Sequence, residues 1–226
     1  VALAVIGLGM MPLVLVNRKY AFVSIHAAGH WVRWTASWMV GLKTEIRGEI
    51  PQGDVLVAAK HQSFLDVILL ASVLPRIKFI YKKQLSLVPV LGSYARYTNS
   101  VPVDRGKRAS AIKQMVAAVN ESRVEPGQLV IFPQGTRVAA GATKPYKVGA
   151  GVLYRETGQP VVPAATNVGV FWKRHGIMRY PGLAVLEFLP AIEPGKEIGD
   201  FMTTVEQAIE SNSDRLMEEA GFTPER

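Results

Sequence analysis

His61 and Asp66 are the residues whose types and spacing point most directly to chemistry. They stand in the stretch Lys60-His61-Gln62-Ser63-Phe64-Leu65-Asp66. A carboxylate beside an imidazole fixes the tautomer of the ring and favours its charged form, as a general base requires. The spacing alone leaves a second interpretation open, in which Asp66 only caps a helix and His61 is a structural loop histidine.

The residues around this stretch predict that it joins a strand to a helix. The apolar run at 55–59 precedes it and favours a buried strand, and the apolar run at 67–74 ends at a proline and favours a helix. Ser63 followed three residues later by Asp66 fits a capping box. We therefore expect Ser63 to be the N-cap and the turn to bring Asp66 back towards His61.

A second loop whose residues could take part in binding or catalysis is Pro133-Gln134-Gly135-Thr136-Arg137, which follows a predicted strand at 128–132. A glycine-containing loop exposes backbone N–H groups, and an arginine can hold a phosphate with two hydrogen bonds. Alone, such a loop says little, but together with the His61–Asp66 stretch it predicts a site for a phosphorylated molecule.

The remaining patterns predict an α/β fold with a central, mostly parallel β-sheet flanked by helices. We expect further strands at 44–48, 76–81, 161–166 and 183–189, a short edge strand at 101–103, and helices at 109–122, 148–157 and 198–220. The last helix is acidic and amphipathic, which favours a solvated outer helix.

The N-terminal residues 1–42 predict a helical hairpin that lies in or dips into one membrane leaflet, ahead of an α/β domain at 43–226. Residues 1–16 are apolar and uncharged, but a helix of that length is shorter than the ~30 Å hydrocarbon core. In the stretch 21–42, the spacing of Trp31, Trp34 and Trp38 puts the three rings on one face, as in interfacial helices. An ordinary buried helix pair is the alternative.

Composition limits the partners. The chain of 226 residues has no cysteine, which excludes disulfides, cysteine-ligated zinc and a cysteine thioester intermediate. Residues 1–190 carry 23 basic and nine acidic side chains, whereas residues 191–226 carry three and nine. A basic body favours an anionic partner such as a phospholipid surface or a phosphorylated substrate. No nucleic-acid-binding motif is present, and we predict no metal site.

Four stretches occur in an order that resembles the glycerolipid acyltransferase family over about residues 43–190. They are the His61–Asp66 stretch, Val103-Asp104-Arg105, Phe132–Arg137 and Val161-Val162-Pro163-Ala164. The resemblance implies transfer of an acyl group from acyl-CoA or acyl-carrier protein to the sn-2 hydroxyl of lysophosphatidic acid. It also implies a membrane anchor, a place on the cytoplasmic face of a bacterial inner membrane, and no cofactor.

The resemblance also implies residue roles. His61 would be the general base and Asp66 would orient it, so that the hydroxyl attacks the thioester directly. The acceptor phosphate would be held by Arg105 and Arg137, with Gly135 and Thr136 shaping the loop. A backbone N–H near Ser63 is a candidate oxyanion donor.

Weaker candidates for contact with the substrates are Lys82, Lys107 and Gln134. The family usually has glutamate where this chain has Gln134, which puts the identity of the acceptor in question. The alternatives are an acyltransferase for another lyso-lipid (for example lyso-ornithine lipid) or for glycerol 3-phosphate, a non-catalytic lipid-binding protein, and a thioesterase.

Overall fold

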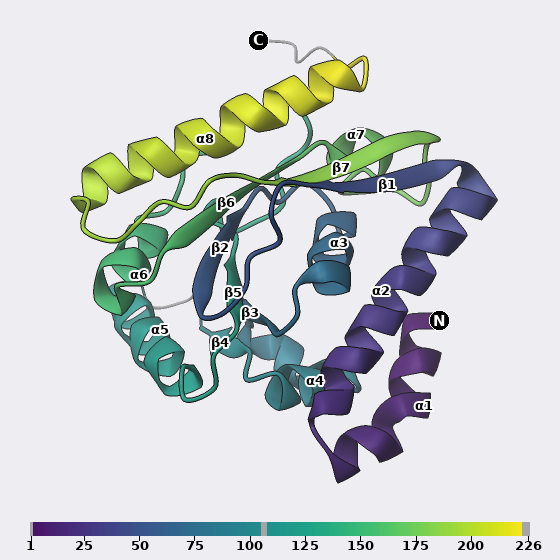
Figure 1. Ribbon diagram of the computed structural model, residues 1–226, viewed down its shortest axis with the longest axis horizontal. Coiled ribbons are helices and arrows are strands. Elements are labelled where there is room, and N and C mark those ends of the chain that lie inside the picture. Colours follow the sequence, from purple (N-terminus) through teal and green to yellow (C-terminus); the bar gives the residue numbers. More distant parts are fainter. Residues whose placement is uncertain (1, 105–107, 223–226) are drawn as a thin grey trace.

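The computed structural model of the protein describes residues 2–104 and 108–222 (Figure 1). Its centre is a seven-stranded sheet in the order β1-β7-β6-β2-β5-β3-β4. The strands are β1 (Leu42–Arg47), β2 (Val55–Ala59), β3 (Ile77–Lys82), β4 (Val101–Val103), β5 (Gln128–Ile131), β6 (Val161–Thr166) and β7 (Gly182–Phe188).

Every neighbouring pair is parallel except β6 and β7, which are antiparallel. The predicted mostly parallel sheet is therefore confirmed. The central strands β2, β5 and β6 are almost entirely buried, as expected when helices cover both faces of a parallel sheet.

The helices form a layer on each face of this sheet (Figure 1). The helices are α1 (Ala2–Val16), α2 (Lys19–Val40), α3 (Leu65–Val73), α4 (Leu91–Tyr97), α5 (Arg108–Ser122), α6 (Gly149–Thr157), α7 (Val168–Phe171) and α8 (Ile198–Glu219), with a 3-10 turn, η1 (Lys83–Leu87). Alternate residues of β2 serve the two layers. Val57 packs with α2 and α3, whereas Leu56 packs with α5, α6 and α8.

Helices α1 and α2 form a hairpin that packs beside α3 and α4 (Figure 1). Gly29 of α2 lies so close to α3 that an added Cβ would sit 2.7 Å from Ser72 Cβ. Tyr94 of α4 ties the hairpin down, because its hydroxyl lies 2.9 Å from both Gly7 O and Ser24 Oγ. Among the described residues, no helix combines the length and apolar character needed to cross a membrane.

The structure corrects two local predictions and adds one short helix. Helix α2 ends at Val40 rather than at 42, because Gly41 adopts the left-handed conformation with φ of 70°. Phe64 rather than Ser63 immediately precedes α3, which begins at Leu65. The short α7 has no counterpart in the predicted elements. Arg33 of α2 points inward, and its Nε donates to Thr44 Oγ1 at 2.8 Å.

Candidate active site

His61 and Asp66 lie in contact where β2 gives way to α3. The two atoms His61 Nδ1 and Asp66 Oδ1 are 2.8 Å apart, and Asp66 is completely buried. Asp66 Oδ2 accepts hydrogen bonds of 2.8 Å from the backbone N–H groups of Gln62 and Ser63. Three hydrogen bonds thus fix the carboxylate, and it selects the tautomer of His61 that carries the proton on Nδ1.

The ring of His61 also stacks on Phe132, the residue that precedes the Pro133–Arg137 loop. The ring centroids are 3.9 Å apart and the interplanar angle is 19°. Beyond this loop, the backbone N–H of Val138 donates to His61 O at 2.7 Å. The His61 loop and the Pro133–Arg137 loop meet because β2 and β5 are parallel neighbours, with Ala58 opposite Ile131. Both loops therefore leave the same edge of the sheet.

The loop after β5 turns at Gly135, whose φ of 69° falls in the left-handed region that favours glycine. A Cβ at this position would lie 2.8 Å from Lys147 Nζ. The turn brings Thr136 and Arg137 to the wall of a cavity that His61 also lines. Arg137 stays partly exposed, and its Nη1 donates to Arg174 O at 3.3 Å.

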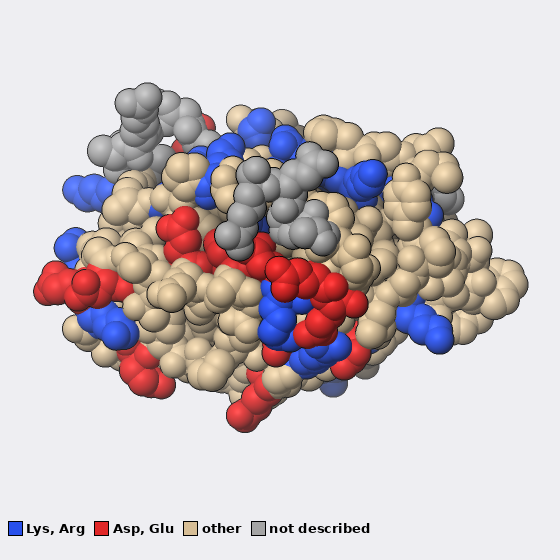
Figure 2. All heavy atoms as spheres, turned by 90° about the horizontal axis from the view of Figure 1, so that it is seen from above, with Lys and Arg blue, Asp and Glu red and all other residues tan. Residues whose placement is uncertain are grey.

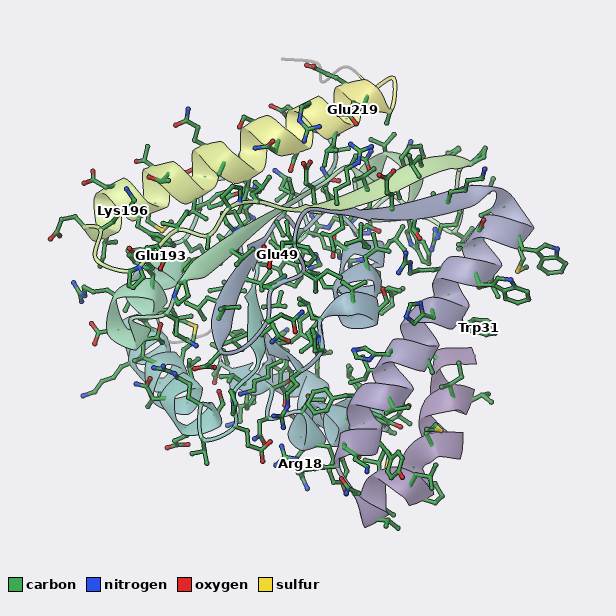
Figure 3. The ribbon with its side chains drawn as sticks, in the orientation of Figure 1. Arg18, Trp31, Glu49, Glu193, Lys196 and Glu219 are labelled. Atoms are coloured by element: carbon green, nitrogen blue, oxygen red, sulfur yellow. The ribbon has the colours of Figure 1, made fainter. Side chains whose placement is uncertain are left out.

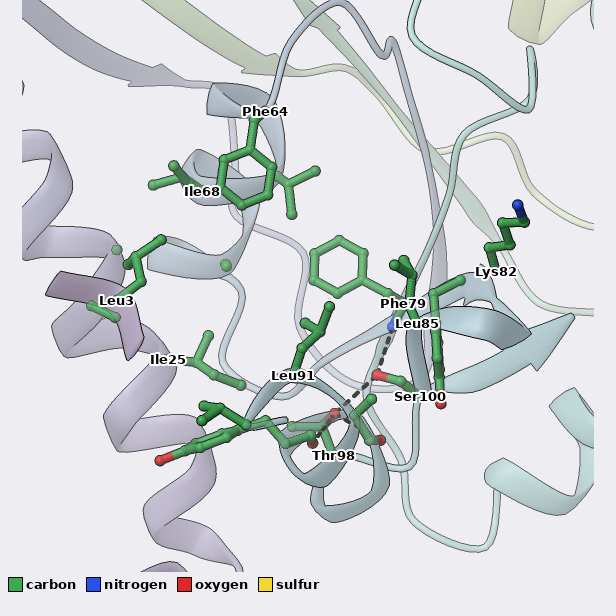
Figure 4. A pocket seen from close by; sticks show the side chains of 18 of the residues that line it. Leu3, Ile25, Phe64, Ile68, Phe79, Lys82, Leu85, Leu91, Thr98 and Ser100 are labelled. Atoms are coloured by element: carbon green, nitrogen blue, oxygen red, sulfur yellow. Dashed lines mark hydrogen bonds between the residues drawn. The ribbon is translucent and has the colours of Figure 1, made fainter. Parts of the chain in front are cut away.

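This cavity has a volume of about 730 Å³ and is mostly apolar. Side chains from α1, α2, α3, β3, η1 and α4 surround it, including Leu3, Ile25, Ile68, Phe79, Leu85 and Leu91 (Figure 4). The volume falls in the range of about 300–1,000 Å³ that is usual for small-molecule sites. One pocket therefore joins a histidine–carboxylate pair and a guanidinium to an apolar chamber.

The other predicted site residues have different surroundings. Lys82 is exposed and lines the same cavity (Figure 4). Gln134 is buried and is not among the residues that line it, because its amide donates to Lys144 O and Glu210 Oε1. The N–H of Ser63 is engaged by Asp66, so it cannot serve as the oxyanion donor. Arg105 and Lys107 lie outside the described residues.

Several site residues were missed by the sequence analysis. The apolar lining from α1 and α2 was assigned only to a membrane hairpin, yet Leu3, Gly7 and Ile25 face the pocket. Behind the site, buried Lys60 forms an ion pair with Glu210 of α8. Lys60 stands next to His61 in the sequence, which was an available signal, whereas nothing in the sequence links it to Glu210.

The arrangement suits proton transfer followed by attack on a carbonyl group. With Nδ1 bound to Asp66, the imidazole can accept a proton at Nε2 from a substrate hydroxyl in the cavity. Among the described residues, no three His, Asp or Glu side chains come together as metal ligands do. His61 and Asp66 can supply general acid–base catalysis, and Arg137 supplies a cation that can hold an anionic group.

Comparison with known proteins identifies the family. The family model described as Acyltransferase matches residues 42–167, which is more than half of the chain. The chain belongs to the acyltransferase family. The acyltransferase is 28% identical over 186 residues to the 1-acyl-sn-glycerol-3-phosphate acyltransferase of Pseudomonas aeruginosa, covering 80% of this chain and 71% of the relative. A Limnanthes alba protein of the same name is 25% identical over 196 residues, covering 85% and 70% of the two chains.

The fold of the acyltransferase is also that of a solved structure. The 1-acyl-sn-glycerophosphate (LPA) acyltransferase of Thermotoga maritima superposes with a TM-score of 0.72 over 88% of this chain and 80% of the other. The sequence identity is 23%, so this likeness concerns the fold. The predicted family and its acyl-transfer activity are confirmed, while the roles of individual residues stay predictions.

Proposed function

We propose that this acyltransferase moves an acyl group from acyl-CoA or acyl-carrier protein to the sn-2 hydroxyl of 1-acylglycerol 3-phosphate, producing phosphatidic acid. The observation that carries the proposal is the His61–Asp66 pair on the wall of an apolar cavity that Arg137 also lines. The names of the relatives support the same acceptor. An acyl chain suits the apolar chamber, and a phosphate suits the cation.

In this mechanism, His61 Nε2 takes the proton from the sn-2 hydroxyl while the oxygen attacks the thioester carbon. The tetrahedral intermediate collapses, the C–S bond breaks, and the leaving thiolate takes the proton back from the imidazolium. Asp66 stabilises the transient positive charge on the ring. A positioned base of this kind typically contributes about 10²–10⁴-fold to the rate.

Arg137 binds the phosphate of the acceptor in this scheme, and Arg105 is proposed to share that role. Thr136 and the turn at Gly135 shape the loop, and Lys82 meets a polar part of one substrate. No cofactor takes part. Because Gln134 faces away from the cavity, its replacement of the usual glutamate leaves the lining of the acceptor site unchanged.

Residues 1–42 form the membrane-facing part in this proposal, and residues 43–226 form the catalytic domain. Trp31, Trp34 and Trp38 are exposed on α2, and Trp31 points away from the sheet (Figure 3). Indole rings favour the membrane–water interface. The hairpin would rest on the cytoplasmic leaflet of a bacterial inner membrane, where the lipid acceptor resides.

The decisive experiment follows thiol release from palmitoyl-CoA with and without 1-acylglycerol 3-phosphate, beside His61→Ala. Release that needs the acceptor and is lost in the variant is the expected result. Release without acceptor would identify a thioesterase, and release only with another lyso-lipid or with glycerol 3-phosphate would replace the acceptor proposed here. If palmitoyl-CoA is inert, palmitoyl-acyl-carrier protein is the second donor to test.

A further inference from the structure

Lys60 is a buried cation directly behind the proposed base. Its side chain is 2% exposed, and it precedes His61 in the loop after β2. Its ammonium pairs with Glu210 Oε2 of α8. Removing an ammonium from water is unfavourable unless a carboxylate compensates it, so the burial of Lys60 depends on the position of Glu210.

The other carboxylate oxygen of Glu210 contacts the segment between β5 and α6. Glu210 Oε1 accepts a hydrogen bond of 2.7 Å from the Tyr146 hydroxyl and one of 3.4 Å from Gln134 Nε2. Burial and the nearby Glu210 carboxylate both raise the pKa of Tyr146, so its hydroxyl stays protonated and donates. One carboxylate thus joins the residue before His61 to the residue before Gly135.

These contacts explain why position 134 is neutral in this chain. The amide nitrogen of Gln134 faces two acceptors, Glu210 Oε1 and Lys144 O at 3.3 Å. A glutamate at this position would place a carboxylate against both of them. The carboxylate next to Gln134 comes from Glu210 of α8, outside the residues 42–167 that match the family model.

We propose that Glu210 is a positioning residue of the active site, which holds the His61 loop and the Gly135–Arg137 loop in register through Lys60 and Gln134. The consequence for catalysis rests on the function proposed above. Among the described residues, Glu210 forms its hydrogen bonds and ion pair with Lys60, Gln134 and Tyr146, none of which lines the cavity, so its effect passes through these neighbours.

The test moves the carboxylate from position 210 on α8 to position 134 in the loop after β5. Glu210→Gln should lower kcat by roughly 10- to 100-fold and raise the acceptor KM, because displacing either loop misplaces a reacting group. Gln134→Glu in the wild-type background should also lower kcat, because it sets two carboxylates together. Combined, the two substitutions should recover most of the activity, because Lys60 regains a carboxylate.

The effect of Gln134→Glu must therefore change sign with the residue at position 210. A Gln134→Glu substitution that is equally harmful in both backgrounds, or Glu210→Gln with wild-type kcat and KM, would overturn the proposal. Lys60→Met should likewise offset Glu210→Gln, because it removes the buried charge. Glu218→Gln is the matched control, since it is the same change at an exposed position on the same helix.

Melting temperatures of all variants separate loss of folding from loss of positioning. If Glu210→Gln or Gln134→Glu fails to fold, the kinetics of Lys60→Met are compared with those of Lys60→Met/Glu210→Gln instead. If the wild-type protein acylates a different lyso-lipid, the proposed acceptor is wrong, but the same sign change is then measured with that lyso-lipid.

Discussion

The orientation of the His61 ring depends on a carboxylate that is itself fixed by the backbone. Asp66 binds the ring through Oδ1 and the N–H groups of Gln62 and Ser63 through Oδ2. Both oxygens are therefore committed before any substrate arrives. This explains how residues five positions apart form a pair, because the loop before α3 folds around the carboxylate instead of continuing as a regular helix.

Asp66→Asn tests the tautomer directly. The amide oxygen can still accept from Gln62 and Ser63, but the amide NH₂ then faces His61 Nδ1 and selects the tautomer that carries its proton on Nε2. That ring cannot accept a proton from the substrate, so we expect kcat to fall about 10²–10⁴-fold. Steady-state thiol release measures this, with a melting curve to confirm folding.

His61→Ala should lose activity to a similar extent, since it removes the base itself. If His61→Ala keeps more than a few per cent of the wild-type kcat, His61 does not act as the general base; if Asp66→Asn does, Asp66 does not set the tautomer of the ring.

Arg137 gives a second prediction at the scale of single residues. Its guanidinium lies on the cavity wall, and among the described residues one N–H is engaged, by Arg174 O, which leaves other donors for an anion. Arg137→Ala should raise the KM for 1-acylglycerol 3-phosphate by at least about tenfold, with little change in the KM for acyl-CoA. Arg137→Lys keeps the charge and should lie between the two. An equal rise in both KM values would assign Arg137 to another role.

At the scale of helices and strands, the sequence best predicted the strands and the loops that directly follow them. Buried runs such as Val161–Thr166 identified strands, and Val101–Val103 was correctly expected at the sheet edge. Parallel strands place their carboxyl ends together, so the meeting of the His61 and Arg137 loops could be anticipated. Contacts between distant segments could not be predicted. The pairing of Lys60 with Glu210 needs the position of α8, which no local pattern contains.

The walls of the apolar cavity were not predicted from the sequence. Helices α1 and α2 form part of them, together with α3, β3, η1 and α4. Apolar residues on an N-terminal helix serve equally well in a membrane or against a neighbouring helix, so composition cannot distinguish the two environments. Deleting residues 1–42 would therefore open the cavity as well as reduce membrane binding, and point substitutions are the sharper tests.

The contact between α2 and α3 gives a stability prediction. A methyl group at Gly29 would meet Ser72 Cβ at 2.7 Å and Ser72 Cα at 3.0 Å. Gly29→Ala should force the helices apart and lower the free energy of unfolding by about 1–3 kcal/mol. Gly9→Ala is the control, because a Cβ at Gly9 of α1 has no neighbour within 4 Å. It should leave stability unchanged or raise it by up to about 1 kcal/mol.

Denaturant titration measures both variants. A Gly29→Ala protein as stable as Gly9→Ala would show that the two helices separate without cost.

At the scale of the whole molecule, charged side chains are spread unevenly over the face that carries α8 (Figure 2). Seen from the α8 side, acidic side chains gather over the middle of the molecule, while the end that holds the junction of α2 and β1 is mostly uncharged (Figure 2). The last turn of α2 exposes Trp38, Met39 and Val40 there. The proposed membrane face therefore extends to the point where α2 meets the sheet.

The loop between α7 and β7, residues 172–181, lies beside this junction, because the N–H of Gly182 donates to Gly41 O at 3.1 Å. Arg179 organises the loop: its guanidinium stacks 3.9 Å from the centre of the Trp172 ring and donates to Gly176 O and Met178 O. This arrangement leaves Ile177 92% exposed and Met178 64% exposed. Two large apolar side chains beside Lys173 and Arg174 suit an anionic lipid surface.

We therefore expect the double substitution Ile177→Glu/Met178→Glu to weaken binding to vesicles containing phosphatidylglycerol by at least about tenfold, since burial of each side chain is worth about 1.5–3 kcal/mol. Val124→Glu is the control, because Val124 is 87% exposed but lies in the loop before β5, a strand that β6 and β2 separate from β7. Co-sedimentation measures binding.

Transfer to a short-chain, water-soluble acceptor should stay at the wild-type rate in both variants, because neither changes the cavity lining. Equal vesicle binding by the two variants would exclude the loop from the membrane face and leave α1 and α2 as its only proposed part.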